Sequence, residues 1–270
     1  MSDFNSHLLP LTRRVRRRII ETIYQAGSGH PGGSLSSVEI GTALFFSIMR
    51  HDPANPLSTD RDRFILSKGH AAPLLYVLLQ EAGYIEEELL PTFRSFGSIL
   101  QGHPSSLKCP GVEVSTGSLG QGLSVASGIA LGNKYNESDS YTYVLLGDGE
   151  LNEGQIWEAA MFASHYNLNN LIAFIDRNRL QIDGMTEEVM GLEPLADKWR
   201  AFNWNVQTIH GHSIPEIEEA VVQAKQSSRP SMIIANTVKG KGVSFMENKV
   251  GWHGKVPSED EYRQALEELQ

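Results

Sequence analysis

The stretch YTYVLLGDGE, residues 141–150, places a short apolar run directly before a Gly-Asp-Gly turn. The run Tyr141–Leu146, unbroken at its end, is typical of a parallel strand that helices bury on both faces. Gly147 and Gly149 allow a tight backbone at the strand end and leave the Asp148 carboxylate free for a cation. On its own an Asp-Gly pair is more often a simple turn, so a binding role needs support from elsewhere in the chain.

The same strand-like pattern recurs along the chain and alternates with helical patterns. The other strand-like runs are Arg63–Ser67, Leu171–Asp176, Asn205–Ile209 and Ser231–Thr237. Apolar residues three and four apart predict helices at Leu119–Tyr135, Gln155–Tyr166, Leu195–Phe202 and Ile214–Gln226. This alternation predicts an α/β fold, a doubly wound and mostly parallel sheet with helices on both faces. Ligands of such sheets bind beyond the carboxyl ends of the strands.

A second oxygen donor follows the next predicted strand. Asn178 lies thirty positions after Asp148, which leaves room for one helix and one strand. Neighbouring parallel strands end at the same edge, so the two side chains can share an ion. A carboxylate, an amide oxygen and a nearby carbonyl suit Mg²⁺, with Ca²⁺ or Mn²⁺ also tolerated. Asn178 alone would more often cap a helix or form a turn, but the pair favours a metal site.

The composition excludes several classes of protein. A chain of 270 residues that is 40% hydrophobic can bury a substantial core. Its net charge of -9 has the wrong sign for a dedicated nucleic-acid binder. The single cysteine, Cys109, cannot form an intrachain disulfide, and the apolar stretch Ala43–Met49 is too short to span a membrane. We therefore expect a cytoplasmic protein with neither nucleic acid nor membrane as a partner.

Five arginines near the start need a separate explanation. They are Arg13, Arg14, Arg16, Arg17 and Arg18. No apolar region of secretory-signal length follows them. On a helix that buries Val15 and Ile19, the arginines form the solvated face; a transit peptide or an anion-binding arm is the alternative.

Several blocks of the sequence resemble one known family. The Gly-Asp-Gly with its later asparagine resembles the signature of the thiamine diphosphate fold family. Five further blocks resemble blocks of transketolases, and they occur in the same order along the chain. The five blocks are Ser28–Gly32, Ser67–Ala71, Gly102–Pro104, Thr116–Gly122 and Trp252–Gly254. The resemblance covers essentially the whole chain and implies the thiamine diphosphate-binding fold.

The resemblance also implies roles for individual residues. Mg²⁺ would be held by Asp148, Asn178 and the carbonyl of Leu180. The cofactor would contact His70, Gly117, Ser118, Leu119, Gly149, Asn178, Lys239 and His253. The substrate channel would be lined by the catalytic histidines His30, His70, His103 and His253. Ser118 stands where many transketolases carry proline, and the remaining histidines, His51, His165, His210 and His212, match no block and are expected to be structural or at the surface.

The length of the chain implies a partner. Transketolases carry a diphosphate-binding, a pyrimidine-binding and a C-terminal domain, and residues 1–270 would form only the first. The chain therefore resembles the N-terminal subunit of a split transketolase, with the charged tail Pro257–Gln270 as a natural end, although a truncation remains an alternative. The partner would bring the other two domains in an α2β2 assembly with the cofactor between the subunits, and Glu153 and Glu158 would lie at a subunit interface.

The implied reaction moves a two-carbon ketol unit from a ketose, or ketose phosphate, to an aldose. A glutamate of the pyrimidine-binding domain is needed, so we expect this chain alone to bind the cofactor weakly and to turn over nothing. The alternatives are the α subunit of a 2-oxo acid dehydrogenase, half of a 1-deoxyxylulose phosphate synthase, and a non-catalytic regulator that keeps the cofactor pocket. The histidine blocks favour the transketolase: the resemblance implies that 2-oxo acid dehydrogenases lack them, and a regulator would need no proton-transfer groups. The synthase half is the more distant option.

Overall fold

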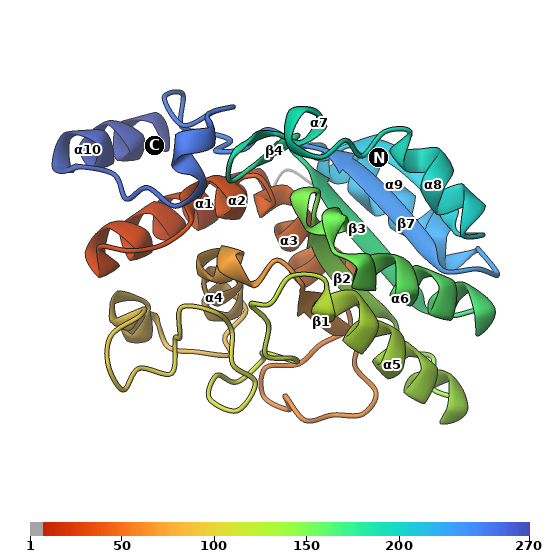
Figure 1. The fold of residues 1–270 in the computed structure, drawn as a ribbon. Coiled ribbons are helices and arrows are strands. Elements are labelled where there is room, and N and C mark those ends of the chain that lie inside the picture. The colour runs from red at the N-terminus through yellow and green to blue at the C-terminus, as the bar shows by residue number, and fades with distance from the viewer. Residues whose placement is uncertain (1–7) are drawn as a thin grey trace.

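Five parallel strands form the central sheet of the computed structural model, which describes residues 8–270 (Figure 1). The strands are β1 (Arg63–Leu66), β2 (Thr142–Gly147), β3 (Leu171–Arg177), β6 (Asn205–His210) and β7 (Ser231–Asn236). They lie in the order β1-β2-β3-β7-β6. Every boundary falls within one residue of the prediction, so the predicted parallel sheet is confirmed.

Helices cover both faces of this sheet. On one face lie α5 (Gln121–Tyr135), α6 (Gly154–His165) and α8 (Leu195–Ala201), and on the other lie α1 (Leu8–Ala26), α3 (Val38–Ala43), α4 (Ala72–Glu81) and α9 (Ile214–Lys225). Successive strand residues point to opposite faces. Val144 and Leu146 of β2 therefore join the core beneath α5 and α6, and Tyr143 and Leu145 join the core beneath α1 and α4. The doubly wound α/β fold is confirmed.

From β1 to β6, each new strand of the central sheet lies farther towards one edge. The order reverses once, because β7 lies back towards β3. β7 is inserted between β3 and β6, so the connection from β6 runs back across the sheet. A right-handed connection in that direction must place its helix on the opposite face, which is where α9 packs. The result is that β1, β2, β3 and β7 lie side by side, with their carboxyl ends at one edge.

Several further elements complete the fold, and the periodicity of the sequence did not predict them. They are the helices α2 (Pro31–Leu35) and α7 (Thr186–Val189), the final helix α10 (Glu259–Glu268), and the antiparallel hairpin of β4 (Leu180–Gln181) and β5 (Gly184–Met185). The helices α3 and α4 were not predicted either. Short 3-10 helices lie at Gly69–Ala71, Glu87–Thr92, Gly149–Asn152 and Val250–His253, and a π-helical turn lies at Leu44–Ile48. Most of these elements are too short to show a period.

Helix α1 carries the five arginines, and the expectation that they form a solvated face is wrong for Arg16. Arg13, Arg14 and Arg17 are exposed, as expected for a solvated face. Arg16, however, is buried: its guanidinium Nη2 donates to Glu39 Oε1 at 2.6 Å and its Nε donates to the Lys241 carbonyl at 2.9 Å. It turns inward because a carboxylate and a carbonyl there satisfy its donors.

The length and apolar character of the helices decide whether any of them could span a membrane. Within residues 8–270, no helix combines the length and the apolar character needed to cross a bilayer.

The packing of α1 gives a first prediction. Ile19 is fully buried on the inner face of α1, so Ile19→Ala should lower the free energy of unfolding by about 2–4 kcal/mol through lost burial and a residual cavity. Urea denaturation followed by circular dichroism measures this. Arg13→Ala, on the exposed face of the same helix, is the matched control and should change stability by less than about 0.5 kcal/mol.

Candidate functional site

A cavity of about 320 Å³ opens where the central strands end. Its walls come from the segments after β1, β2, β3 and β7 and from the loops at residues 28–33, 102–119 and 250–254. The sequence-predicted site residues that line it are His30, His70, His103, Gly117, Leu119, Asp148, Gly149, Asn178, Leu180, Lys239 and His253. Ser118 is the one predicted residue that does not line the cavity, and it is exposed.

Asp148 presents a buried carboxylate at the end of β2. Its Oδ1 accepts from the Gly149 amide at 2.8 Å, and its Oδ2 accepts from the Arg179 amide at 2.5 Å and from Arg177 Nη1 at 3.3 Å. Burial, followed by the nearby Asp176 carboxylate, raises the pKa of Asp148 to about 6. A cation in the cavity would relieve both effects.

Asn178 lies beside it because β2 and β3 pair in register. Gly147 is opposite Asp176 in the ladder, so the residues that follow each strand emerge next to one another. Asn178 is buried; its Nδ2 donates to Asp176 Oδ2 at 2.9 Å, and its Oδ1 accepts from the Leu180 amide at 3.1 Å. An amide oxygen has a second lone pair, which leaves one for another ligand.

Lys239 brings a cation into the same cavity. Its Nζ donates to the Leu180 carbonyl at 3.2 Å and lies 3.0 Å from Nδ1 of His253. Burial lowers the pKa of Lys239 to about 8, while Asp148 and Asp176 favour its charged form. The ammonium is therefore a candidate to bind an anionic ligand such as a phosphate.

The oxygens in this cavity fit a hard divalent cation. A carboxylate, a carboxamide oxygen and a backbone carbonyl are the ligands that Mg²⁺ and Ca²⁺ prefer. The Leu180 carbonyl already contacts a positive charge, the Lys239 ammonium. Among residues 8–270 there is no cluster of three or more His, Cys, Asp or Glu side chains that could hold a metal ion, so a cation here depends on this mixed set of donors.

Three histidine rings meet on the other side of the cavity. The ring centroids of His30, His70 and His253 lie 5.1 to 5.4 Å apart. Burial lowers the pKa of His30 to about 4 and that of His253 to about 3, with neighbouring cationic groups adding to the effect, and it also lowers the pKa of His70. These rings are neutral at pH 7, and each can donate through one nitrogen and accept through the other. Nδ1 of His30 is buried and has no hydrogen-bond partner among the described residues.

His103 occupies a different position, at the cavity rim. The residue is exposed, yet partial burial of its ring and the Arg94 guanidinium lower its pKa. Arg94 also lowers the pKa of His30, after burial itself. The guanidinium of Arg94 is held by the Ser28 hydroxyl and by the Gly102 carbonyl, at 3.4 Å for the latter. The sequence analysis missed Arg94, because a single arginine outside the matching blocks gives no signal.

Two glycines make close backbone approach possible beside the rings. A Cβ on Gly69 would lie 2.8 Å from the Gly117 nitrogen. Gly117 itself has a φ of 153°, and a Cβ there would lie 3.1 Å from the His103 ring. Any larger side chain at either position would push these two loops apart.

A second missed residue, Glu150, ties the loops around the cavity together. Its buried carboxylate accepts from the Ser67 hydroxyl at 2.5 Å, from the Gly120 amide at 2.8 Å and from the Gly147 amide at 2.9 Å. Burial raises its pKa. A buried carboxylate with three donors from three segments fixes the loops after β1 and β2 and the loop before α5 relative to one another. Its position directly after the Gly-Asp-Gly turn was the available signal.

The remaining histidines stay away from the cavity, as expected. His165 and His210 are exposed. His51 lies with its Nε2 at 2.7 Å from the Phe45 carbonyl, and Nδ1 of His212 lies 2.8 Å from Glu39 Oε2. The first two are surface residues, and the other two join parts of the fold.

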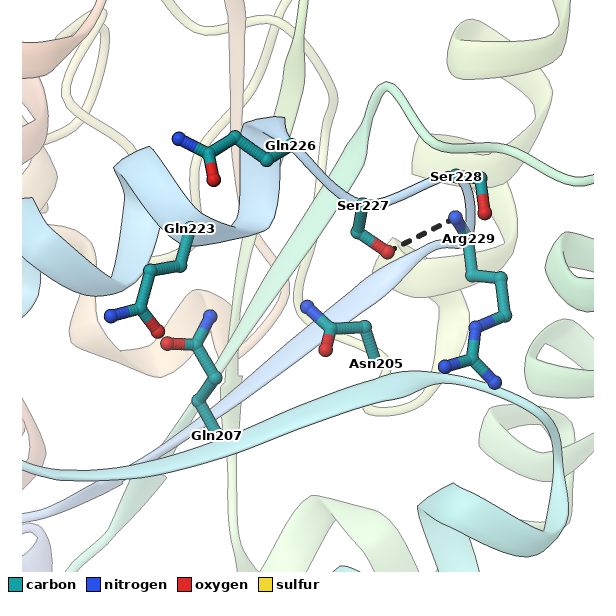
Figure 2. Close-up of a pocket in the computed structure, with 7 residues that line it drawn as sticks. All are labelled: Asn205, Gln207, Gln223, Gln226, Ser227, Ser228 and Arg229. Carbon is teal, nitrogen blue, oxygen red and sulfur yellow. Dashed lines mark hydrogen bonds between the residues drawn. The ribbon is translucent and has the colours of Figure 1, made fainter.

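A separate hollow of about 350 Å³ lies at the opposite end of the sheet (Figure 2). It is lined by Asn205, Gln207, Gln223, Gln226, Ser227, Ser228 and Arg229. Several of these polar groups already bond within the chain: Gln207 Nε2 donates to the Ala220 carbonyl at 2.9 Å, and Arg229 Nη1 donates to Asn203 Oδ1 at 2.9 Å. None of the seven lining residues is a carboxylate, a histidine or a cysteine, so this hollow offers no group for the acid–base chemistry that the cavity at the carboxyl ends supplies.

Comparison with known proteins places the chain in a family. A family model described as "Transketolase, thiamine diphosphate binding domain" matches residues 11–269. The chain belongs to this transketolase family. Its family membership agrees with the resemblance of the sequence blocks and with the position of the cavity.

Individual relatives in the transketolase family are closely similar. The chain is 49% identical over 271 residues to the 6-deoxy-6-sulfo-D-fructose transketolase subunit SqwG of Clostridium sp., covering 100% of this chain and 98% of that protein. It is 48% identical over 259 residues to one of the subunits of the apulose-4-phosphate transketolase of Phocaeicola vulgatus, covering 96% of this chain and 92% of that protein. Both relatives are named as parts of a transketolase.

Solved transketolases have the same fold but are longer. The Campylobacter jejuni transketolase superposes with a TM-score of 0.93 at 34% identity, covering 98% of this chain. The chain spans only 43% of that enzyme. The thiamine diphosphate-binding fold is thereby confirmed.

The low pKa values of the cavity histidines give a second prediction. In the unfolded chain His30 takes up a proton near pH 6.5, whereas in the folded chain its pKa is about 4 and it stays neutral to that pH. The unfolded state binds more protons in that interval, so stability falls as the pH drops from about 6.5 towards 4. His30→Asn should make this fall shallower, as measured by urea midpoints between pH 7 and 4. His165→Asn, on the exposed end of α6, should leave the slope as it is.

Proposed function

We propose that this chain is the diphosphate-binding subunit of a thiamine diphosphate-dependent transketolase. The reaction moves a two-carbon ketol unit from a ketose, or ketose phosphate, to an aldose. The observation that carries the proposal is a single cavity that joins oxygen donors for a divalent cation to a group of neutral histidines. Residues 1–270 would form one diphosphate-binding domain, of which residues 1–7 lie outside the described part, and the pyrimidine-binding and C-terminal domains would come from a partner.

The polar side of the cavity would hold the cofactor's diphosphate. Asp148, Asn178 and the Leu180 carbonyl are the proposed ligands of Mg²⁺, and Ca²⁺ or Mn²⁺ would suit the same oxygens. The Lys239 ammonium would donate to diphosphate oxygens, which offsets their charge, and the Gly149 amide would join it by exchanging its bond to Asp148 Oδ1 for one to the diphosphate. Gly117 and Leu119 would lie against the thiazolium, where a small residue and an apolar side chain permit contact.

The histidine side would handle the substrate. When bound, thiamine diphosphate supplies the carbon nucleophile for the cleavage of the ketose carbon–carbon bond. His30, His70 and His253 have lowered pKa values and stay neutral at pH 7, so their rings can hydrogen-bond substrate hydroxyls. Nδ1 of His253 already faces the Lys239 ammonium, which leaves its Nε2–H as a donor to substrate. His103, exposed at the rim, would meet the substrate as it enters.

The surface around the cavity supports a partner subunit. Ile182 lines the cavity and is 65% exposed, and Met190, on the segment after α7, is 61% exposed. The apolar side chain of Ile182, exposed at the wall of the cavity, would be covered by the proposed partner.

A second subunit contact would involve α6. Glu153 and Glu158, the two acidic residues expected at an interface, are both exposed, and so are the apolar side chains of Met161 and Phe162 on the same helix. This combination is consistent with the proposed α2β2 assembly in the cytoplasm.

The names of two relatives suggest a chemical class for the donor substrate. The similar subunits belong to enzymes named for apulose-4-phosphate and for 6-deoxy-6-sulfo-D-fructose. Both names describe ketoses that carry an anionic group. We propose an anionic ketose as donor and an aldose phosphate as acceptor.

Reconstitution tests the proposed function. The purified chain should be inactive alone, because the glutamate of the pyrimidine-binding domain is missing. Mixed with the product of an adjacent gene that carries the other two domains, it should transfer a ketol unit in the presence of Mg²⁺ and thiamine diphosphate. Mass spectrometry of products from a panel of ketose phosphates measures the transfer, and light scattering measures the α2β2 mass.

The outcomes separate the candidate functions. Turnover by the chain without a partner contradicts the subunit proposal. A complex that binds the cofactor but converts no ketose indicates a regulator, and a product passed to a lipoyl group indicates a 2-oxo acid dehydrogenase.

The proposed metal ligands can be tested in the same complex. Asp148→Asn should weaken Mg²⁺-dependent binding of thiamine diphosphate at least tenfold, because the cation loses its only carboxylate from this set. Calorimetric titration with and without Mg²⁺ gives the affinity. Asp183→Asn is the matched control: Asp183 also lines the cavity, but it is exposed and the affinity should stay within about twofold.

A further inference from the structure

We propose that Asp176 is a positioning residue that orients the carboxamide of Asn178, so that its oxygen faces the cation and its NH₂ group faces inward. The inference rests on the proposed function, since it concerns the same cation. Asp176 is fully buried at the end of β3, two residues before Asn178, and it also lines the cavity. Neither the blocks nor the sequence analysis assigned it a role.

The hydrogen bonds of Asn178 determine its orientation. Its Nδ2 donates to Asp176 Oδ2 at 2.9 Å, and its Oδ1 accepts from the Leu180 amide at 3.1 Å. A carboxylate only accepts and a backbone amide only donates, so the reverse orientation would place donor against donor and acceptor against acceptor. The two ends of the carboxamide are therefore distinguished by their surroundings, and Asp176 is the partner that selects the NH₂ end.

Asp176 is in turn held rigidly by donors from three other segments. Its Oδ2 accepts from Lys68 Nζ at 2.6 Å and from the Ser36 hydroxyl at 2.6 Å, and its Oδ1 accepts from the Thr237 hydroxyl. Lys68 Nζ also donates to the Gly33 carbonyl and to the Ser37 hydroxyl, both at 2.7 Å. This buried ion pair compensates the carboxylate charge and leaves the Asp176 group no freedom to turn.

This arrangement explains why an asparagine can act as a metal ligand here. A carboxamide that is free to flip presents its NH₂ group to the cation in one of two orientations, and that orientation is repulsive. Hydrogen bonds behind a metal ligand commonly contribute about tenfold to hundredfold in affinity. Asp176 supplies that bond while its own negative charge is balanced by Lys68.

A pair of substitutions separates orientation from general stability. Asp176→Asn removes the acceptor-only partner and should weaken Mn²⁺ binding at least tenfold, with Mn²⁺ as a paramagnetic probe in the two-subunit complex with thiamine diphosphate. The double variant Asp176→Asn with Asn178→Asp should recover most of this loss. A carboxylate at position 178 has oxygen at both ends and needs no orientation, and an asparagine at position 176 can donate to it.

Controls make the result specific. Asp176→Asn and the double variant both remove the carboxylate that faces Lys68. If Asp176 only stabilised the fold, both would therefore bind Mn²⁺ equally poorly. Unfolding in EDTA measures their metal-free stability. Ser36→Ala deletes one donor to Asp176 without changing the orientation of Asn178, and its Mn²⁺ affinity should stay within about twofold of wild type.

The outcomes distinguish this inference from the proposed function. If the wild-type complex binds no Mn²⁺, the proposed cation site fails. If wild type binds Mn²⁺ but Asp176→Asn binds it equally well, or the double variant recovers nothing, only the role of Asp176 is overturned. If Asp176→Asn does not fold, nuclear magnetic resonance of the wild-type chain decides: a slowly exchanging, hydrogen-bonded Asn178 NH₂ group supports the role, and a rapidly exchanging one contradicts it.

Discussion

The parallel pairing of β2 with β3 is the constraint on which the candidate site depends. Thr142 lies opposite Leu171 and Gly147 lies opposite Asp176, with every intervening residue in register. Both strands end together, so the Asp148 carboxylate after β2 lies against the segment that follows β3. There it accepts a hydrogen bond from the Arg179 amide. A shift of one residue would turn every side chain of β3 to the other face and remove Asp176 from its partners. The buried apolar residues on both faces prevent that shift.

The second constraint is that the charges of the buried ionisable groups around the cavity must compensate one another. Asp176 has Lys68 at 2.6 Å, and Asp148 has Arg177 at 3.3 Å. For Asp176, burial opposes ionisation, but the Lys68 charge together with the hydrogen bonds from Lys68, Ser36 and Thr237 outweighs it and lowers the pKa to about 2. Asp148 is less well compensated, and burial raises its pKa. The residual negative charge therefore lies where the oxygen donors converge, which is the electrostatic condition for binding a cation.

The sequence predicted the larger elements and most of the cavity, for identifiable reasons. Strands such as Leu171–Arg177 are buried throughout, and a helix such as α1 carries its buried apolar residues with a clear period, so both leave a strong pattern. The Gly-flanked histidines were found because they lie in recognisable blocks. Arg94 and Glu150 were missed as site residues because they bond to segments distant in the chain, and the burial of Arg16 was missed for the same reason. Asp176 lies only two residues before Asn178, but the Lys68 and Ser36 donors that hold it are also distant. No local pattern reveals a contact that only folding creates.

One such distant contact limits when the site can form during synthesis. Arg16 Nε donates to the Lys241 carbonyl, 225 residues along the chain, and the amide of Val238 donates to Nε2 of His212, whose other nitrogen contacts Glu39. These bonds hold the segment that carries Lys239. The Arg16 guanidinium on α1 can meet the Lys241 carbonyl only after residue 241 has left the ribosome. During synthesis, the segment that carries Lys239 therefore cannot be anchored to α1 before residue 241 is made.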